Sequence, residues 1–167
     1  GSSFAYTKDS NSKLTVYGEL VDVTTTYDGI TYSGKTVAVA SIGDTYYYSL
    51  QDAFDALPST EPSTYPTIKI LGNRIEQVEL STTRYGIVDL NGKTWSTRNF
   101  NLYGTGGSNN KSNITITDNS GSIGSIISSI PGIYISDTQM NLKLIKGNYA
   151  GYYGVFFKGD TLTIGDS

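Results

Sequence analysis

The sequence predicts an all-β protein, organised as a parallel β-helix (a solenoid) of about five coils with an N-terminal β-hairpin and a short α-helix as its cap. Three observations predict it. The 167 residues include 14 tyrosines, and about a quarter of the chain is serine or threonine. Threonine and tyrosine fit the pleated surface of a sheet well. Short alternating segments recur at intervals that suit one coil of a solenoid, and one segment has helical spacing.

Composition removes several classes of function. The chain has no cysteine and no histidine, which excludes disulfides, thiolate zinc sites, cysteine nucleophiles and Ser-His-Asp triads. A net charge of −3, with the basic residues scattered, argues against nucleic-acid or anionic-membrane partners. No apolar run approaches the ~20 residues of a membrane span, and the sequence includes no signal peptide, which we expect to lie outside it. We therefore expect no cofactor, no metal, no nucleic-acid partner and no membrane insertion.

Residues 1–36 are predicted to form an N-terminal arm that carries a β-hairpin. Asp28-Gly29 separate the β-prone runs 14–27 and 30–33. Asp-Gly between two such runs is a strong hairpin signal, because both central turn residues need positive φ. An arm that packs across the cap would be structural, whereas an arm that projects would be available to a preceding domain.

Residues 37–66 are predicted to form a second hairpin, a helix and a linker. Gly43-Asp44 mark the tight turn of the hairpin. The segment 50–57 places its apolar residues on one face at α-helical spacing. Ser49 precedes it as a candidate N-cap, and Pro58 ends it. The proline-containing stretch up to residue 66 then reads as a linker.

Residues 67–167 repeat, and we expect the last coil to be truncated at the C-terminus. Alternating segments, each followed closely by Gly, Asn or Asp, begin at residues 68, 88, 114, 142 and 162. Such short strands are stable only when stacked, and stacking ~4.8 Å apart would send alternate side chains into a shared core. Asx side chains at the turns are expected to hydrogen-bond along the stack. The expected inward residues are Ile68, Ile70, Val88, Leu90, Ile114, Ile116, Leu142, Leu144, Leu162 and Ile164.

The residues between the inward ones test this register. The expected outward column is uniformly polar, as a face toward solvent should be, and in it Lys69 would lie beside Asp89 of the next coil. The alternative architecture is a β-sandwich in which chance alternation imitates a repeat. The expected outward column consists of Lys69, Asp89, Thr115, Lys143 and Thr163.

Several motifs resemble those of a known family, over roughly residues 37–167. They are Ile42-Gly-Asp-Thr45, Ser49-Leu-Gln-Asp-Ala53, Asp89-Leu-Asn-Gly-Lys93, Ile114-Thr-Ile-Thr-Asp-Asn-Ser-Gly121 and Gly159-Asp-Thr-Leu-Thr-Ile-Gly165. Together they resemble the pectate-lyase-like, right-handed parallel β-helix modules of secreted and cell-surface proteins of Gram-positive, often gut-dwelling, bacteria. The resemblance implies a right-handed helix and an extracellular or cell-surface location. It implies no particular activity, because these motifs form coils and are no catalytic signature.

The same family includes polysaccharide lyases and glycoside hydrolases, so such an enzyme, or a fragment of one, is the alternative function. Hydrolysis needs two carboxylates, and the candidates Asp89 and Asp118 come from successive coils. A lyase like those of the family needs a basic residue beside carboxylates that hold Ca²⁺. Arg98 is a candidate, with Arg74 and Arg84, but no aspartate cluster accompanies these arginines. Salt bridging and turn formation are the competing interpretation of the aspartates.

Tyrosines are the predicted binding residues, because exposed aromatic rings stack on sugars and anchor protein contacts. The competing interpretation is that many of these rings cover the cap or the strands. Threonine pairs at 115/117 and 161/163 raise the idea of an ice-binding ladder, which Lys143 would interrupt. The predicted binding residues are Tyr46, Tyr47, Tyr48, Tyr149, Tyr152 and Tyr153.

We therefore expect a non-catalytic extracellular module that acts as a spacer, an adhesion surface or a binding surface of a bacterial envelope protein. Its expected partners are glycans or host and cell-surface proteins. An uncapped terminal coil exposes strand edges, which adds an end-to-end homodimer through the C-terminal coil to the expected partners.

Overall fold

The computed structural model describes residues 10–97, 100–101, 111–128, 133–135, 140–151 and 154–166. These residues form four sheets and one helix, α1 (Leu50–Asp55). A two-stranded sheet pairs β1 (Glu19–Tyr27) with β2 (Ile30–Ala38). The seven-stranded sheet contains, in chain order, β3 (Ala40–Ile42), β4 (Thr45–Tyr47), β5 (Thr67–Ile70), β8 (Tyr85–Asp89), β11 (Ser112–Thr117), β14 (Met140–Leu144) and β17 (Thr161–Ile164). One four-stranded sheet contains β6 (Arg74–Ile75), β9 (Thr94–Thr97), β12 (Ser125–Ser128) and β15 (Asn148–Ala150). The other contains β7 (Val78–Glu79), β10 (Phe100–Asn101), β13 (Ile133–Ile135) and β16 (Val155–Phe157).

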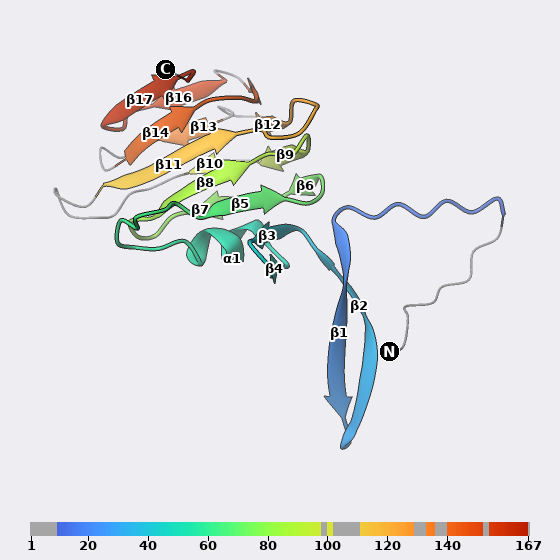
Figure 1. Ribbon diagram of the computed structural model, residues 1–167. Coiled ribbons are helices and arrows are strands. Elements are labelled where there is room, and N and C mark those ends of the chain that lie inside the picture. The colour runs from blue at the N-terminus through green and yellow to red at the C-terminus, as the bar shows by residue number, and fades with distance from the viewer. Residues whose placement is uncertain are drawn as a thin grey trace.

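From β5 onward the chain visits the three larger sheets in a fixed order. Each set of three consecutive strands supplies one strand to each sheet, so that β5, β6 and β7 are followed by β8, β9 and β10. Strands of successive sets pair in parallel, and the sets lie one above another in Figure 1. Side chains that are far apart in the sequence therefore become neighbours on adjacent strands.

The expected fold class, an all-β right-handed parallel β-helix of about five coils with an N-terminal β-hairpin and short α-helix as its cap, is corrected by the strand directions. The sheets are mixed: β3 pairs antiparallel with both β4 and β5, and β1 pairs antiparallel with β2. Loop length is the physical reason for two of these pairs, β1 with β2 and β3 with β4, whereas β5 reaches β3 only after β4 and α1. Two-residue turns join only antiparallel strands, whereas a parallel pair needs a longer crossover. The described chain is thus a mixed β protein that carries one short helix.

Both predicted hairpin turns are confirmed. Asp28 and Gly29 have φ values of 48° and 74°, the left-handed conformation that a tight hairpin turn requires at both central positions. In the second turn Gly43 has a φ of 56°. The sequence chemistry of the turns therefore determined where the chain reverses.

The predicted helix is confirmed, although it ends at Asp55 and not at residue 57. Ser49 is its N-cap, and the Ser49 side chain accepts the backbone N–H of Asp52 at 3.0 Å. A second cap comes from the residue that follows β6, because the Glu76 carboxylate accepts the backbone N–H groups of Leu50 and Gln51 at 2.8 and 3.2 Å. Two acceptors at one end satisfy N–H groups that have no partner within the helix.

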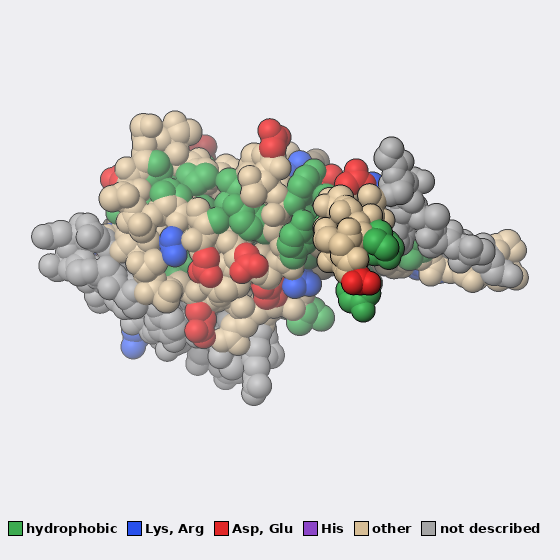
Figure 2. Space-filling model, turned by 90° about the horizontal axis from the view of Figure 1, so that it is seen from below, with side chains coloured by type: hydrophobic (Ala, Val, Ile, Leu, Met, Phe, Trp, Pro, Cys, Tyr) green, Lys and Arg blue, Asp and Glu red, His purple; other side chains and the backbone are tan. Residues whose placement is uncertain are grey.

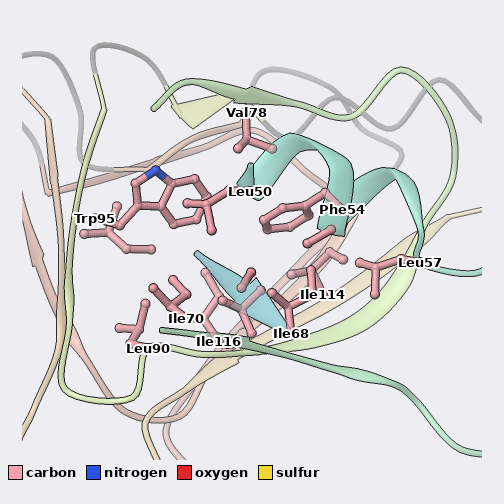
Figure 3. Packing of buried hydrophobic residues seen from close by; sticks show 14 of the residues in the cluster. Leu50, Phe54, Leu57, Ile68, Ile70, Val78, Leu90, Trp95, Ile114 and Ile116 are labelled. Carbon is pink, nitrogen blue, oxygen red and sulfur yellow. The ribbon is translucent and has the colours of Figure 1, made fainter. Parts of the chain in front are cut away.

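The core lies between the three larger sheets and includes the buried face of α1. The ring centroids of Phe54 and Trp95 lie 5.8 Å apart, and Figure 3 shows both rings in the cluster with Leu50 of the helix. The indole N–H of Trp95 donates to the backbone oxygen of Glu76 at 2.8 Å. Seen from the end where α1 lies, hydrophobic side chains also reach the surface, with acidic side chains beside them (Figure 2).

Eight of the ten expected inward residues are buried, namely those between Ile68 and Leu144. The other two are not: Leu162 is 36% exposed and Ile164 is 75% exposed. Both belong to β17, the last strand in the order of its sheet, which pairs with β14 alone. A strand with one neighbour leaves part of its surface uncovered.

The expected register between strands is wrong by two residues at one step. Val88 pairs with Ile116, and Ile114 pairs with Gly86. Because side chains alternate with period two, a shift of two residues leaves every side chain on its predicted face. The expected outward column therefore divides into two. One column runs Lys69, Asp89, Thr117, and the other runs Thr67, Ile87, Thr115, Lys143, Thr163.

Asx side chains do hydrogen-bond along the stack, as predicted. The Asn91 side-chain amide donates to the backbone oxygen of Ile70 at 2.9 Å, and the Asn73 side-chain oxygen accepts the N–H of Thr94 at 2.9 Å. Both bonds join one set of strands to the next, so they satisfy backbone groups where the chain leaves a strand.

Candidate functional site

The strongest candidate site is a groove on the outward face of the seven-stranded sheet. It has a volume of about 330 Å³. We name it the ladder groove, because the strands β11, β14 and β17 place polar side chains side by side in it, about 4.8 Å apart from strand to strand. Asn113 lies opposite Asn141, and Asn141 lies opposite Thr161. The groove is lined by Glu61, Tyr65, Asn113, Ile114, Thr115, Asn141, Leu142, Lys143, Thr161 and Thr163.

A second row of the ladder groove continues the column described above. Thr115 lies opposite Lys143, which lies opposite Thr163. The two rows together give the groove a regular grid of amide, hydroxyl and ammonium groups. The outward positions of β11 and β14 follow from strand alternation, since each is flanked in sequence by buried residues such as Ile114 and Leu142.

The rim of the ladder groove comes from the linker before β5. The phenol of Tyr65 donates to Oε1 of Glu61 at 2.7 Å. The Tyr65 ring meets the Tyr85 ring edge-on, with centroids 6.0 Å apart, a favourable geometry for two aromatic rings. The linker is tied to the sheet by its backbone, because the N–H of Ile87 donates to the oxygen of Pro66 at 2.9 Å.

Tyr65 is a neutral hydrogen-bonding group at any physiological pH. Burial, and then the hydrogen bond to the Glu61 carboxylate and its charge, together raise the pKa of Tyr65 to about 12. Tyr65 therefore presents an uncharged ring and a fixed hydroxyl at the groove.

Charge in the ladder groove is largely balanced. Its one cation, Lys143, forms an ion pair of 3.0 Å with Asp166. The groove also holds the Glu61 carboxylate, which accepts a hydrogen bond from Tyr65. A ligand entering the described groove thus meets mainly uncharged donors and acceptors.

The predicted tyrosines of β4 and its turn lie elsewhere. Tyr46 and Tyr48 are exposed and line a separate groove of about 400 Å³ at the base of the β1–β2 ribbon. The phenol of Tyr46 donates to the Glu19 carboxylate at 3.0 Å. Tyr47 instead packs against the hydrophobic core. One of three consecutive rings is therefore used for packing, as alternation along a strand requires.

Tyr149 lies on β15, at the opposite end of the stack from β4. It packs against the core, and its phenol donates to the backbone oxygen of Lys146 at 3.3 Å. Burial, and then the negative charge of Asp118, raise the pKa of Tyr149. The structure therefore does not bring Tyr149 together with Tyr46 and Tyr48. The remaining predicted binding residues, Tyr152 and Tyr153, lie outside the described residues, as does the catalytic candidate Arg98.

Asp89 is predicted to face solvent, but only 6% of it is exposed. Its Oδ1 accepts the backbone N–H groups of Asn91 and Asn119, at 2.9 and 3.0 Å, and its Oδ2 accepts the side-chain amide of Asn119 at 3.3 Å. Turn residues thus cover a position that alternation places on the outer face. The ion pairs among the described residues do not include one between Asp89 and Lys69.

Asp118 is 2% exposed and also serves a turn. Its Oδ2 accepts the N–H groups of Gly92 and Gly124 at 2.9 and 2.7 Å, and its Oδ1 accepts the N–H of Ser120 at 2.9 Å and the Ser120 hydroxyl. Burial by itself would raise the pKa of Asp118, but these hydrogen bonds outweigh burial and lower the pKa below its ordinary value.

Asp89 and Asp118 are brought together as a reciprocal clasp between two turns. Asp89 accepts from Asn119 of the later turn, and Asp118 accepts from Gly92 of the earlier turn. Each carboxylate oxygen already accepts at least one hydrogen bond. This geometry supports turn formation, the competing interpretation of the pair, because a general acid or base needs an oxygen that can reach a substrate.

Sequence reasoning missed Glu61, Tyr65, Asn113 and Asn141 as groove residues. The asparagines carry a usable signal, since each immediately precedes an inward residue and so points outward. Glu61 and Tyr65 carry none, because nothing local shows that the linker folds over the sheet. Among the described residues, no group of three or more acidic side chains is arranged to hold a metal ion.

Comparisons of the chain with family models, with curated proteins and with solved structures find no match. The resemblance to pectate-lyase-like modules accordingly rests on the quoted motifs alone. In the described part of the chain, no helix has the length and apolar character needed to cross a membrane.

Proposed function

We propose that this protein is a non-catalytic extracellular module and that its ladder groove binds a segment of a neutral polysaccharide. The observation that carries the proposal is the paired column of Asn113, Asn141 and Thr161 beside that of Thr115, Lys143 and Thr163. Amide and hydroxyl side chains both donate and accept hydrogen bonds, which matches the hydroxyl groups of a sugar.

The repeat of the groove supports a polymer over a single sugar. Polar groups recur at the strand spacing of ~4.8 Å, and a pyranose ring has about this length. A chain lying along the stack would therefore meet a similar set of donors and acceptors at each successive residue. Tyr65 adds an aromatic ring at the rim, the kind of surface on which sugar rings pack.

The charges of the groove favour a neutral polysaccharide over an acidic one. Lys143 is paired with Asp166, and Glu61 contributes a negative charge at the rim. An acidic polymer would be repelled by these carboxylates, and it would have to compete with Asp166 for the ammonium group.

A binding role is also supported over hydrolysis. Glycoside hydrolysis uses two carboxylates across the scissile bond. Glu61 is the one carboxylate that lines the described groove, and Asp89 and Asp118 belong to the turn clasp. The proposal therefore assigns adhesion or attachment, rather than turnover, to this face.

The test is calorimetric titration of the protein with soluble neutral polysaccharides, such as a β-glucan, a xylan and a galactomannan, and with polygalacturonate. We expect binding to at least one neutral polymer and weaker binding to polygalacturonate. The double variant Asn113→Ala, Asn141→Ala should weaken binding about fivefold or more, since two lost hydrogen bonds at ~0.5–1.5 kcal/mol each are worth ~1–3 kcal/mol. Asn148→Ala is the matched control, because Asn148 is exposed on β15 of another sheet.

Three outcomes would contradict the proposal. The first is binding to none of the neutral polymers, and the second is equal loss in the control and the double variant. The third is the release of reducing ends or unsaturated products from any polymer, which would support the enzymatic alternative.

A further inference from the structure

The β1–β2 ribbon projects from the body of the molecule (Figure 1). Its strands pair over nine residue pairs, from Glu19 opposite Ala38 to Tyr27 opposite Ile30. A two-stranded hairpin alone is marginally stable in water, and it usually needs packing on one face. A long projecting ribbon therefore raises the question of what covers it.

The two faces of the ribbon differ in chemistry. Directly opposed residues share a face, and neighbours along a strand alternate. One face carries the ion pair of Asp22 with Lys35, at 2.5 Å, and the hydroxyl contact of Thr26 with Thr31, at 3.3 Å. We call the other the apolar face. Its base pair is Glu19 with Ala38, and the rest of it consists of Val21, Val23, Thr25, Tyr27, Ile30, Tyr32, Gly34 and Thr36.

The apolar face is covered at its base and bare at its tip. Val21 is 9% exposed, whereas Tyr27, Ile30 and Tyr32 are 74%, 55% and 53% exposed. Figure 2 looks along the ribbon onto this tip, where hydrophobic side chains lie at the surface beside an acidic one. Contiguous apolar surface of this kind marks an interaction site in soluble proteins.

We propose that the occupant is a second copy of this chain, docked apolar face to apolar face about a two-fold axis. The apolar face has no charged residue between Val21 and Tyr27 or between Ile30 and Thr36, and Glu19 at its base already accepts a hydrogen bond from Tyr46. Two such faces can meet without burying an unpaired charge, and a two-fold axis applies the same patch to itself. The ion-paired faces of the two ribbons then point outward to solvent.

The area available indicates a weak, reversible dimer. Taking ~250 Å² for a fully exposed tyrosine side chain, the fractions above leave about 400 Å² bare on Tyr27, Ile30 and Tyr32 of each copy. Two copies would bury about 800 Å² from these residues, which lies below the ~1,200–2,000 Å² of stable complexes. We therefore expect dimers at upper micromolar protein concentrations and monomers well below them.

Sedimentation equilibrium over a range of protein concentrations measures this directly. The wild-type weight-average mass should rise from that of a monomer toward that of a dimer. The double variant Tyr27→Ser, Tyr32→Ser should raise the dissociation constant at least tenfold. Tyr48→Ser is the matched control, since Tyr48 is also half exposed but lies outside the ribbon. Circular dichroism of each variant checks that the body is folded.

Cross-linking then identifies the face. Because the chain has no cysteine, Thr25→Cys places a single thiol on the apolar face and Thr26→Cys places one on the opposite face. A short bis-maleimide should link Thr25→Cys chains into dimers much faster than Thr26→Cys chains.

The proposal is overturned by a wild-type protein that stays monomeric at millimolar concentration, by a dimer that the ribbon variants leave intact, or by equal cross-linking of the two cysteine variants. It does not depend on the ladder groove, so polysaccharide binding and dimer formation can fail separately.

Discussion

Replacing Asp118 by asparagine is expected to be among the most destabilising conservative changes in the protein. The carboxylate accepts three backbone N–H groups, from Gly92, Ser120 and Gly124, and the hydroxyl of Ser120. Asparagine keeps the size of the side chain but turns one acceptor oxygen into a donor NH₂ group. The substitution therefore tests the hydrogen bonds and not the packing.

The magnitude follows from the better of the two amide orientations. If the NH₂ group takes the place of Oδ1, it faces the Ser120 hydroxyl, which can turn to accept, and the Ser120 N–H, which loses its partner. A buried donor without a partner costs ~1–3 kcal/mol. The bonds from Gly92 and Gly124 also lose the assistance of a charge, which roughly halves their strength. We expect a loss of about 2–4 kcal/mol in the free energy of unfolding.

Urea denaturation, followed by the fluorescence of the single tryptophan, Trp95, measures this loss. Asp44→Asn is the control, because Asp44 is exposed at the second hairpin turn, and it should change stability by less than ~0.5 kcal/mol. An Asp118→Asn protein within ~1 kcal/mol of the wild type would refute the reasoning that the clasp holds the two turns together.

The same variant has a predicted pH dependence. The folded-state pKa of Asp118 lies below the ordinary value of 3.8. Its ionised form therefore stabilises the fold above that value, and this contribution is lost as the pH falls through the lower folded-state pKa. On acidification from pH 5 to pH 3, wild-type stability should fall more steeply than that of Asp118→Asn. Parallel slopes in urea titrations would contradict this sign.

Three further outcomes are expected. Gly72→Ala should displace the segment before β1, because a Cβ at Gly72 would clash with the backbone nitrogen of Gly18. Faster limited proteolysis of that segment would show the displacement, and unchanged cleavage would count against it. Trp95→Phe should lower the free energy of unfolding by about 2–4 kcal/mol, because it leaves a cavity and removes the hydrogen bond to the Glu76 oxygen. Denaturation followed by circular dichroism measures this loss, and a smaller loss would contradict the prediction. In alkaline spectrophotometric titration, Tyr65→Phe should remove one phenol that ionises near pH 12. A tyrosine whose pKa is raised in the folded state contributes stability at lower pH, and this contribution is lost as the pH rises through the folded-state pKa. The wild type should therefore lose stability near pH 12, and Tyr65→Phe should lack this loss.

Much of the local structure follows from the sequence. Asp28-Gly29 and Gly43-Asp44 mark turns that the chain makes, and Ser49 caps the helix that it precedes. The expected inward residues up to Leu144 are buried. These features depend on neighbouring residues alone, through turn chemistry and the period-two alternation of a strand.

The candidate site could be predicted only in part. Thr115, Lys143 and Thr163 form an outward column, as the alternation of their strands indicates. Glu61 and Tyr65 join them because a linker without periodic pattern is bonded to the sheet through its backbone. Asp89 is the opposite case, since alternation places it outward and a distant turn covers it.

Sequence alone thus determined which residues up to Leu144 face inward, where the two hairpins reverse the chain and where the helix begins. Tertiary structure decided the strand register, the mixed directions of the sheets, the packing of the linker residue Tyr65 on Tyr85 and the projection of the β1–β2 ribbon. The reason is physical. The alternation of side chains is a property of each strand's own sequence, and a register shift of two residues does not change it. Pairing between strands some 20–28 residues apart is instead selected by the total burial and hydrogen bonding of the whole chain.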